Sequence, residues 1–228
     1  MKEQIENIKA KLQKLASIDT KLQLFGASTH KYNLQPTLTT QAVQAFEALH
    51  NVSLPEGYAA FLTQVGNGGA GPFYGLKPLE DGTILFKGKS SAEDIKLDLS
   101  KPFPHTISWN VDEDELEDLH DKIEDAADAG NTKLEQELYE QKWKMISEAH
   151  HDYGRLNLAD YGRGVHISLI VNGPQAGFMW TDDRANDGGI YPSNELGNFT
   201  KISFLDWYEL WLDEGIKEIE IRNAEQPA

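Results

Sequence analysis

The sequence contains no cysteine among its 228 residues. A disulfide framework, a zinc site with thiolate ligands and a cysteine nucleophile are therefore excluded, and redox chemistry gives no clue to the compartment. The chain also lacks an apolar run long enough to cross a membrane. The charged segment Met1–Asn7 lacks the apolar core of a signal peptide. We therefore expect a cytoplasmic protein that does not bind membranes.

Basic side chains are also scarce. The chain has 21 Lys and Arg against 37 Asp and Glu, a formal net charge of -16. Binding of nucleic acid depends on neutralising phosphates, so this balance argues against a nucleic-acid partner. It favours a basic partner, although acidic balance also serves solubility alone. At this length one compact domain buries on the order of 70% of its unfolded surface, which is enough core without covalent staples.

Motifs of catalysis are missing as well. The sequence has no Gly-x-Ser-x-Gly elbow, no phosphate loop ending in Gly-Lys-Ser/Thr and no His-Glu-x-x-His. Gly66, Gly68 and Gly71 match the spacing of a dinucleotide-binding turn. That turn must lie between a strand and a helix, however, whereas here a helical pattern precedes the glycines and Pro72 follows them. We predict a shaped structural loop, no cofactor and no enzymatic activity.

Two segments resemble metal sites only weakly. His150 and His151 lie beside acids in Glu148–Asp152, but adjacent histidines at a helix end are expected to point in different directions. The polar loop Thr181–Gly189 lacks the third ligand of a calcium-binding EF-hand, since Arg184 or Ala185 stands at that position. We therefore predict no metal site.

Hydrophobic periodicity predicts both helices and strands. An amphipathic helix is expected over residues 2–24, with Ile5, Ile8, Leu12 and Leu15 on its apolar face, followed by a linker at 26–36. Further helices are expected from Thr39 or Thr40 to Asn51 with Val43, Phe46 and Leu49 buried, from Pro55 to Val65, and from Ser203 with Phe204, Trp207, Tyr208 and Trp211 as an aromatic face. Strands are expected at 83–86, 165–171 and 177–180, with a polar loop at 181–189 that leads into 190–192. A turn is expected at 87–90, and an irregular segment at 91–110 that Trp109 anchors on the core.

The segment 111–151 is the most acidic part of the chain. It predicts two helices separated near Gly130-Asn131. Its acids form either a solvated helical face or an electrostatic docking surface, because like charges spaced i,i+4 destabilise a helix and need compensation. We also expect Trp180 in the core, with exposed loop acids after it. The candidate partner-binding residues are Asp112, Glu113, Asp114, Glu115, Glu117, Asp118, Asp121, Asp182 and Asp183.

Several motifs together resemble the SUKH superfamily. They are Leu-Pro-x-x-Tyr-x-x-Phe-Leu from Leu54, Gly-Asn-Gly-Gly-x-Gly-Pro-x-Tyr-Gly-Leu from Gly66, Gly154-Arg155-Leu156, Asp160-Tyr161-Gly162, Leu169–Pro174, Gly177–Asp182 and Phe204–Leu212. They span roughly residues 40 to 214. Where the family often has Gly-Cys-Gly, this chain has Gly162-Arg163-Gly164.

The resemblance implies a single α+β domain with a mostly antiparallel sheet packed with N-terminal, middle and C-terminal helices. We assign 1–35 to the N-terminal helix and linker, 36–216 to the SUKH-like domain with the acidic segment 111–151 within it, and 217–228 to a charged tail. Bacterial members are mostly immunity proteins, so the resemblance implies neutralisation of a cognate polymorphic toxin by stoichiometric occlusion of its basic surface, with nucleases among the candidate toxins. The alternative is a scaffold or regulatory module resembling the fungal cell-wall-assembly regulators, docking through the N-terminal helix and the glycine-aromatic loop.

Overall fold

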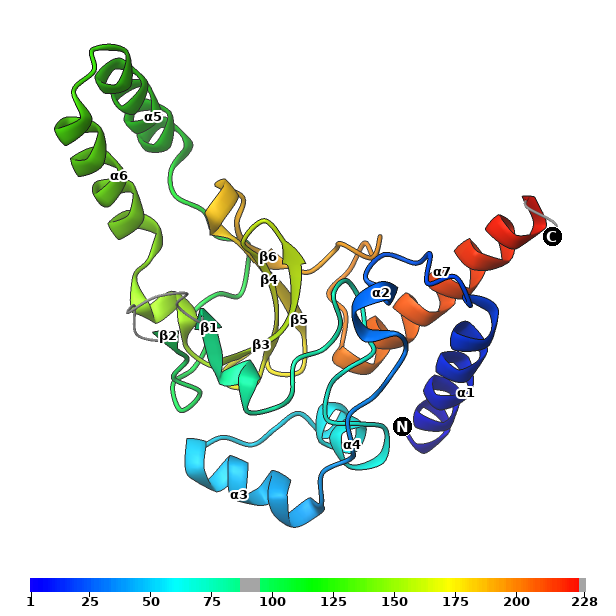
Figure 1. Ribbon diagram of the computed structural model, residues 1–228. Coiled ribbons are helices and arrows are strands. Elements are labelled where there is room, and N and C mark those ends of the chain that lie inside the picture. Colours follow the sequence, from blue (N-terminus) through cyan, green and yellow to red (C-terminus); the bar gives the residue numbers. More distant parts are fainter. Residues whose placement is uncertain (87–94, 226–228) are drawn as a thin grey trace.

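The computed structural model describes residues 1–86 and 95–225. Helices flank an antiparallel four-stranded sheet, with a small two-stranded sheet beside it (Figure 1). This is the α+β class that the sequence predicts. The turn expected at 87–90 lies outside the described residues. Among the described helices, none is both long and apolar enough to cross a membrane.

The helices are α1 (Lys2–Ile18), α2 (Ala27–His30), α3 (Thr40–His50), α4 (Glu56–Gln64), α5 (Glu113–Asp128), α6 (Thr132–Ile146) and α7 (Phe204–Glu225). The strands are β1 (Ile84–Phe86), β2 (Ile95–Lys96), β3 (Arg155–Gly162), β4 (Val165–Ile170), β5 (Met179–Asp183) and β6 (Gly189–Pro192). Short 3-10 turns are η1 (Asp81–Thr83), η2 (Ala149–Asp152) and η3 (Arg184–Asn186). The strand β2 lies in a stretch that was expected to be irregular.

The main sheet has the order β3-β4-β5-β6, and each neighbouring pair is antiparallel. The strands β3 and β4 are joined by a tight turn in which Arg163 and Gly164 both have positive φ, 52° and 82°. The predicted return strand after Asn172-Gly173 is confirmed as β5. A polar loop was expected from Thr181, but β5 runs on to Asp183, because these residues pair with β4 on one side and β6 on the other.

A small core cluster lies against β4, β5 and β6. Trp180 is 1% exposed and packs edge-on against Phe103, with Ile170 and Ile190 beside them. Trp109 packs on this cluster and exchanges two backbone hydrogen bonds with Ile190, of 2.7 and 2.8 Å. The predictions that Trp180 is a core residue and that Trp109 anchors its segment are both confirmed.

The N-terminal helix packs along α7 (Figure 1). Its four apolar residues, Ile5, Ile8, Leu12 and Leu15, are buried, so this stripe is covered by the domain itself. The helix ends at Ile18 and not near residue 24, because the Asp19 carboxylate accepts hydrogen bonds from the Gln23 and Leu24 amides and fixes a turn. The segment expected to be a linker contains the short helix α2.

The C-terminal helix begins as predicted. The Ser203 hydroxyl donates to the Asp206 carboxylate (2.6 Å), and the predicted aromatic face is buried. A charged tail was expected from Lys217, but α7 continues to Glu225. The reason is that Ile219, beyond the expected end, is fully buried in the main core.

The glycine-rich loop joins α4 to the rest of the domain. Gly69 and Leu76 exchange two backbone hydrogen bonds (2.9 and 2.8 Å), and the Ala70 amide donates to the Asn33 carbonyl (2.7 Å). Gly68 and Gly69 have φ of 90° and 101°. These amides therefore bind protein carbonyls, as a structural loop requires.

The helix α3, before this loop, begins at its predicted cap. Leu49 is 76% exposed and not buried as expected, because it lies on the outer face of the helix.

Candidate protein-binding site

The helices α5 and α6 form a hairpin that extends away from the sheet (Figure 1). Gly130 joins them with a positive φ of 65°, and the Asn131 side chain caps α6 by accepting from the Leu134 amide (3.2 Å). The predicted break near Gly130-Asn131 is confirmed. The hairpin has a small core of its own, formed by Leu119, Ile123, Ala126 and Leu138.

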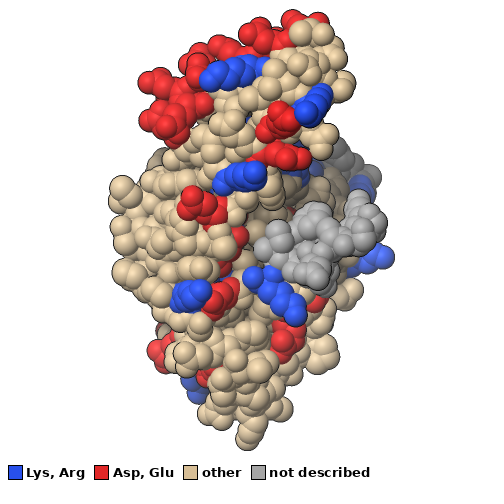
Figure 2. Space-filling view, turned by 90° about the vertical axis from the view of Figure 1, so that its left-hand side faces the viewer, with Lys and Arg blue, Asp and Glu red and all other residues tan. Residues whose placement is uncertain are grey.

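Acidic side chains cover the outer surface of α5. All seven candidate acids of this segment are exposed: Asp112, Glu113, Asp114, Glu115, Glu117, Asp118 and Asp121. Figure 2 shows acids gathered over the outer end of the hairpin, at the top of the view, with few basic side chains among them. Among the described residues, Asp118 alone of the seven has an ion-pair partner, Lys122 at 2.7 Å. We call α5 and α6 with these acids the acidic hairpin.

Part of this acidity has a structural reason. The Asp112 carboxylate caps α5 by accepting from the amides of Asp114 and Glu115 (3.1 and 3.3 Å). Acids in the first turn of a helix also interact favourably with its dipole. That effect ends within the first turn, so it leaves Glu117 and Asp121 unexplained. Their charge lowers helix stability through like-charged i,i+4 pairs, which favours a role outside the fold.

The candidate residue Asp182 does not belong to an exposed surface. It is 4% exposed, and its carboxylate binds the guanidinium groups of Arg155 (2.7 Å) and Arg184 (2.8 Å). Arg184 also binds the Asp152 carboxylate (2.6 Å), and Arg155 contacts the same carboxylate. The prediction of an exposed Asp182 is wrong because the strand continues through it. We call Asp152, Arg155, Asp182 and Arg184 the charge quartet.

The charge quartet keeps Asp182 ionised. Burial alone raises the pKa of this carboxyl group, but the charges and hydrogen bonds of Arg155 and Arg184 outweigh burial and hold its pKa well below the usual range. Asp183, its neighbour, is half-buried, and its carboxylate accepts from the Asn186 side chain (2.7 Å). The two acids thus differ in environment, and neither is an unbound loop acid.

A groove of about 570 Å³ lies at the base of the acidic hairpin. Its apolar lining comes from Leu85, Trp143, Ile146, Ala149 and Ala185, and its polar lining from Ser147, His166 and three members of the charge quartet, Asp152, Asp182 and Arg184. Pockets that combine an apolar wall with a few fixed polar groups are typical binding sites. No local pattern in the sequence predicts this groove, because its lining comes from segments far apart in the chain.

Two aromatic side chains of α6 face solvent near this groove. Trp143 is 58% exposed and Tyr139 is 53% exposed. They are spaced i,i+4 and therefore lie on one face of the helix. Trp143 also lines the groove. Exposed Trp and Tyr beside a concave site are the residues that most often dominate the energy of protein interfaces.

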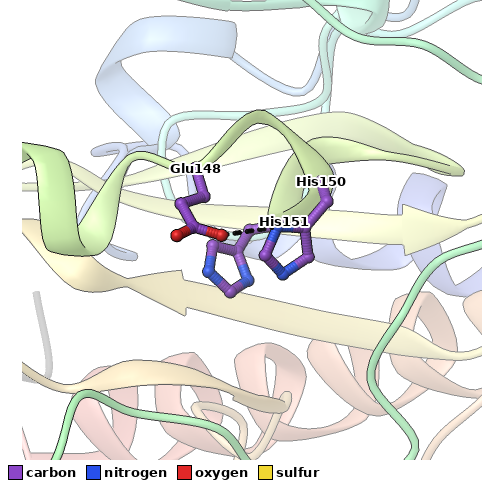
Figure 3. A group of neighbouring side chains, drawn as sticks. All are labelled: Glu148, His150 and His151. Atoms are coloured by element: carbon purple, nitrogen blue, oxygen red, sulfur yellow. Dashed lines mark ion pairs between the residues drawn. The ribbon is translucent and has the colours of Figure 1, made fainter.

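A histidine cluster lies in η2, which connects α6 to β3 (Figure 3). The His150 Nδ1 atom is 3.0 Å from a carboxylate oxygen of Glu148, and the rings of His150 and His151 lie 4.0 Å apart between centroids. The expectation that the adjacent histidines point apart is wrong, because the 3-10 turn places both rings on the same side as Glu148 (Figure 3). Among the described residues, these form the one group of three or more side chains whose potential metal-ligand atoms all lie within 4.8 Å of one another.

His151 has two further partners that sequence reasoning missed. Its Nδ1 atom is 2.9 Å from Nε2 of His105, 46 residues away, and its ring lies 3.9 Å from that of Trp109 between centroids. Burial, with the nearby charges of His150 and Arg184, lowers the pKa of His151 to about 3, and burial lowers that of His105 to about 4. Both rings are therefore neutral at pH 7, and one donates to the other.

His166 also gains a partner in the fold. Its Nδ1 atom is 2.7 Å from a carboxylate oxygen of Asp160, which in turn binds Lys77 (3.1 Å). The pair lies on neighbouring strands, since His166 and Asp160 face each other across β3 and β4. Through His166 this chain of contacts reaches the groove.

Comparison with known proteins gives no match: no family model fits the sequence, and no curated protein or solved structure is detectably similar. Function is therefore inferred from the fold, the geometry of the site and the sequence motifs.

Proposed function

We propose that this chain is a non-enzymatic immunity protein that binds a cognate polymorphic toxin in the cytoplasm and neutralises it by stoichiometric occlusion. The observation that carries the proposal is the acidic hairpin, which extends from the sheet with its acids exposed (Figures 1 and 2). An extended, charged element of this kind offers surface to a partner without disturbing the core. The proposal also rests on the resemblance of the motifs to the SUKH superfamily, whose bacterial members are mostly immunity proteins.

Electrostatics indicates the chemistry of the partner. The chain carries a net charge of -16, and the acids of α5 concentrate it at one end of the molecule. A toxin domain that acts on nucleic acid presents a basic surface to phosphates. An acidic inhibitor attracts that surface at long range and speeds the encounter. The groove and the exposed Trp143 beside it would then supply the apolar contacts that slow dissociation.

Co-expression tests the proposed function. A candidate toxin domain, taken from a gene adjacent to the one that encodes this chain, is produced in a host cell with and without the chain, and growth is scored. We expect growth to be restored only when the chain is present. The purified pair should form a complex of one chain per toxin domain. Growth arrest despite expression of the folded chain would contradict the proposal.

Three acids beyond the first turn of α5 are expected to speed capture of the toxin. The variant carries Glu117→Gln, Asp118→Asn and Asp121→Asn. We expect its association rate to fall by roughly 3- to 10-fold at low salt and its salt dependence to flatten, because charges at the rim of an interface act mainly on the rate of encounter. Stopped-flow or surface-binding kinetics over a range of salt concentrations measures both effects.

The matched control removes the same charge elsewhere. Glu3→Gln, Glu214→Gln and Glu225→Gln neutralise three exposed acids on α1 and α7. This variant should keep the association rate of the parent chain. Equal slowing in both variants would mean that net charge alone steers association, and the acidic hairpin would have no special part in docking.

A specific observation favours a second candidate, the scaffold or regulatory module. Phe25, Tyr74 and Tyr161 are 51%, 47% and 42% exposed and form an aromatic patch, with ring centroids 5.2 Å (Phe25–Tyr74) and 6.2 Å (Phe25–Tyr161) apart. That alternative expects docking through the glycine-aromatic loop and the N-terminal helix. Tyr74 lies at the end of this loop and is exposed, whereas the apolar stripe of α1 is covered by α7. If a Tyr74→Ala variant loses partner binding while the acidic-hairpin variant keeps it, this candidate replaces the first.

A further inference from the structure

The histidine cluster has the composition of a transition-metal site. Glu148 offers a carboxylate and His150 and His151 each offer an imidazole nitrogen, all within 4.8 Å of one another (Figure 3). Two imidazoles with one carboxylate form the ligand set of several zinc sites that keep a fourth position open. The His150 Nδ1 atom lies 3.0 Å from a carboxylate oxygen of Glu148. This is close to the separation of about 3.3 Å between two ligand atoms of a tetrahedral zinc ion.

The surroundings hold the inner ligand in place. His151 is 2% exposed, and its Nδ1 atom is hydrogen-bonded to His105, so Nε2 is the nitrogen that it can offer to an ion. A hydrogen bond from the second ring nitrogen to a fixed partner is the usual support of a metal-bound histidine. Trp109 packs against the same ring, with the two centroids 3.9 Å apart. These contacts orient His151 before any ion arrives.

The outer two ligands can adjust. The side chains of His150 and Glu148 are 45% and 63% exposed, so both can turn toward an ion without displacing core side chains. The charge quartet lies nearby, but its two guanidinium groups are matched by two carboxylates. The carboxylate of Glu148 is therefore the uncompensated charge next to the imidazoles, and it favours a cation.

We propose that Glu148, His150 and His151 bind one divalent transition-metal ion of the class that prefers imidazole, such as Zn²⁺. The site lies in η2, between the end of α6 and the start of β3. A bound ion would link two exposed side chains to the ring fixed by His105 and Trp109, and so brace the joint between the acidic hairpin and the sheet. This inference is independent of the proposed toxin binding.

Titration of the full chain with Zn²⁺ alone tests the site. Calorimetry should show saturable binding of one ion per chain, and the melting temperature should rise with Zn²⁺ concentration, because an ion that binds the folded chain stabilises it. His150→Ala and Glu148→Gln each remove a proposed ligand. Loss of a residue that only supports a ligand weakens metal affinity by roughly 10- to 100-fold, so each variant should lose at least that much. Both variants should melt close to the parent chain without metal, since the replaced side chains are 45% and 63% exposed and neither lies in the core.

His120→Ala is the matched control. His120 lies in the acidic hairpin, and its side chain is 46% exposed. Its Nε2 atom is 3.4 Å from a carboxylate oxygen of Asp187, so this histidine also has an acid beside it. Its removal should leave Zn²⁺ affinity unchanged. The proposal is overturned if the parent chain shows no saturable binding, or if His150→Ala and Glu148→Gln both bind Zn²⁺ as the parent does. Loss of binding in the His120 variant alone would place the site elsewhere and would equally overturn it.

Discussion

Replacement of Asp182 by asparagine is expected to lower the free energy of unfolding by about 3–5 kcal/mol. The substitution keeps the size of the side chain and removes its charge. Arg155, which is 1% exposed, and Arg184, which is 8% exposed, would then share the single carboxylate of Asp152. A buried guanidinium group without a matching negative charge is strongly unfavourable, so the loss should far exceed that for a surface ion pair. Chemical denaturation at pH 7 measures it.

The pH dependence of the same variant gives a second test. The charge quartet lowers the pKa of Asp182 in the folded state below its value of about 3.9 in the unfolded chain. The resulting stability is fully present above the unfolded pKa and is lost as the pH falls toward the folded pKa. The difference between parent and Asp182→Asn should therefore be constant near neutrality and narrow below about pH 4.

The neighbouring acid supplies the control. Asp183→Asn changes the same chemical group one residue along the chain, but Asp183 is half-buried and has a neutral partner, Asn186. We expect its stability to change by less than about 1 kcal/mol. If the two variants were equally stable, the ion pairs of Asp182 would contribute little to the stability of the fold. They would then not be what holds the polar lining of the groove in place.

Local patterns explain why much of the fold could be predicted. The leucines of α5 recur at helical spacing, and Gly130-Asn131 supplies a residue with positive φ followed by a cap, so the hairpin follows from neighbouring residues alone. The same holds for α7, whose aromatic face and Ser203 cap lie within two turns. The ends of the helices were harder to predict than their positions. Ile219 extends α7 through a contact with a distant core, which the charged composition of the C-terminal segment conceals.

The candidate site depends mostly on contacts between distant segments. Asp182 looked like a loop acid because nothing beside it in the sequence shows that Arg155, 27 residues earlier, points at it across the sheet. The pairing of His105 with His151 is likewise invisible before folding. Exposure of the α5 acids could be predicted, since a charged helical face is exposed wherever the helix packs. The extension of the hairpin beside a groove could not.

Replacement of Gly69 by alanine is expected to lower the stability of the fold by roughly 3 kcal/mol or more. Gly69 has a φ of 101°, where a side chain is strained. An added Cβ would also lie 2.3 Å from the Asn33 carbonyl oxygen, which is backbone and cannot turn away. Both effects act on a residue that links Leu34 and Leu76 through bridge pairings. For a chain of this size the melting temperature should fall by roughly 6–12 °C.

Gly82→Ala separates this effect from the general loss of a glycine. An added Cβ at Gly82 would meet its nearest atom, the Asn157 carbonyl oxygen, at an ordinary 3.5 Å. Its stability should stay level or rise by up to about 1 kcal/mol, because alanine reduces the entropy of the unfolded chain. A Gly69 variant that melts like the parent would mean that the loop can shift away from Asn33. The glycine-rich segment would then be a flexible surface loop. Close approach of two backbone segments would no longer explain why glycines stand at the spacing of a dinucleotide-binding turn.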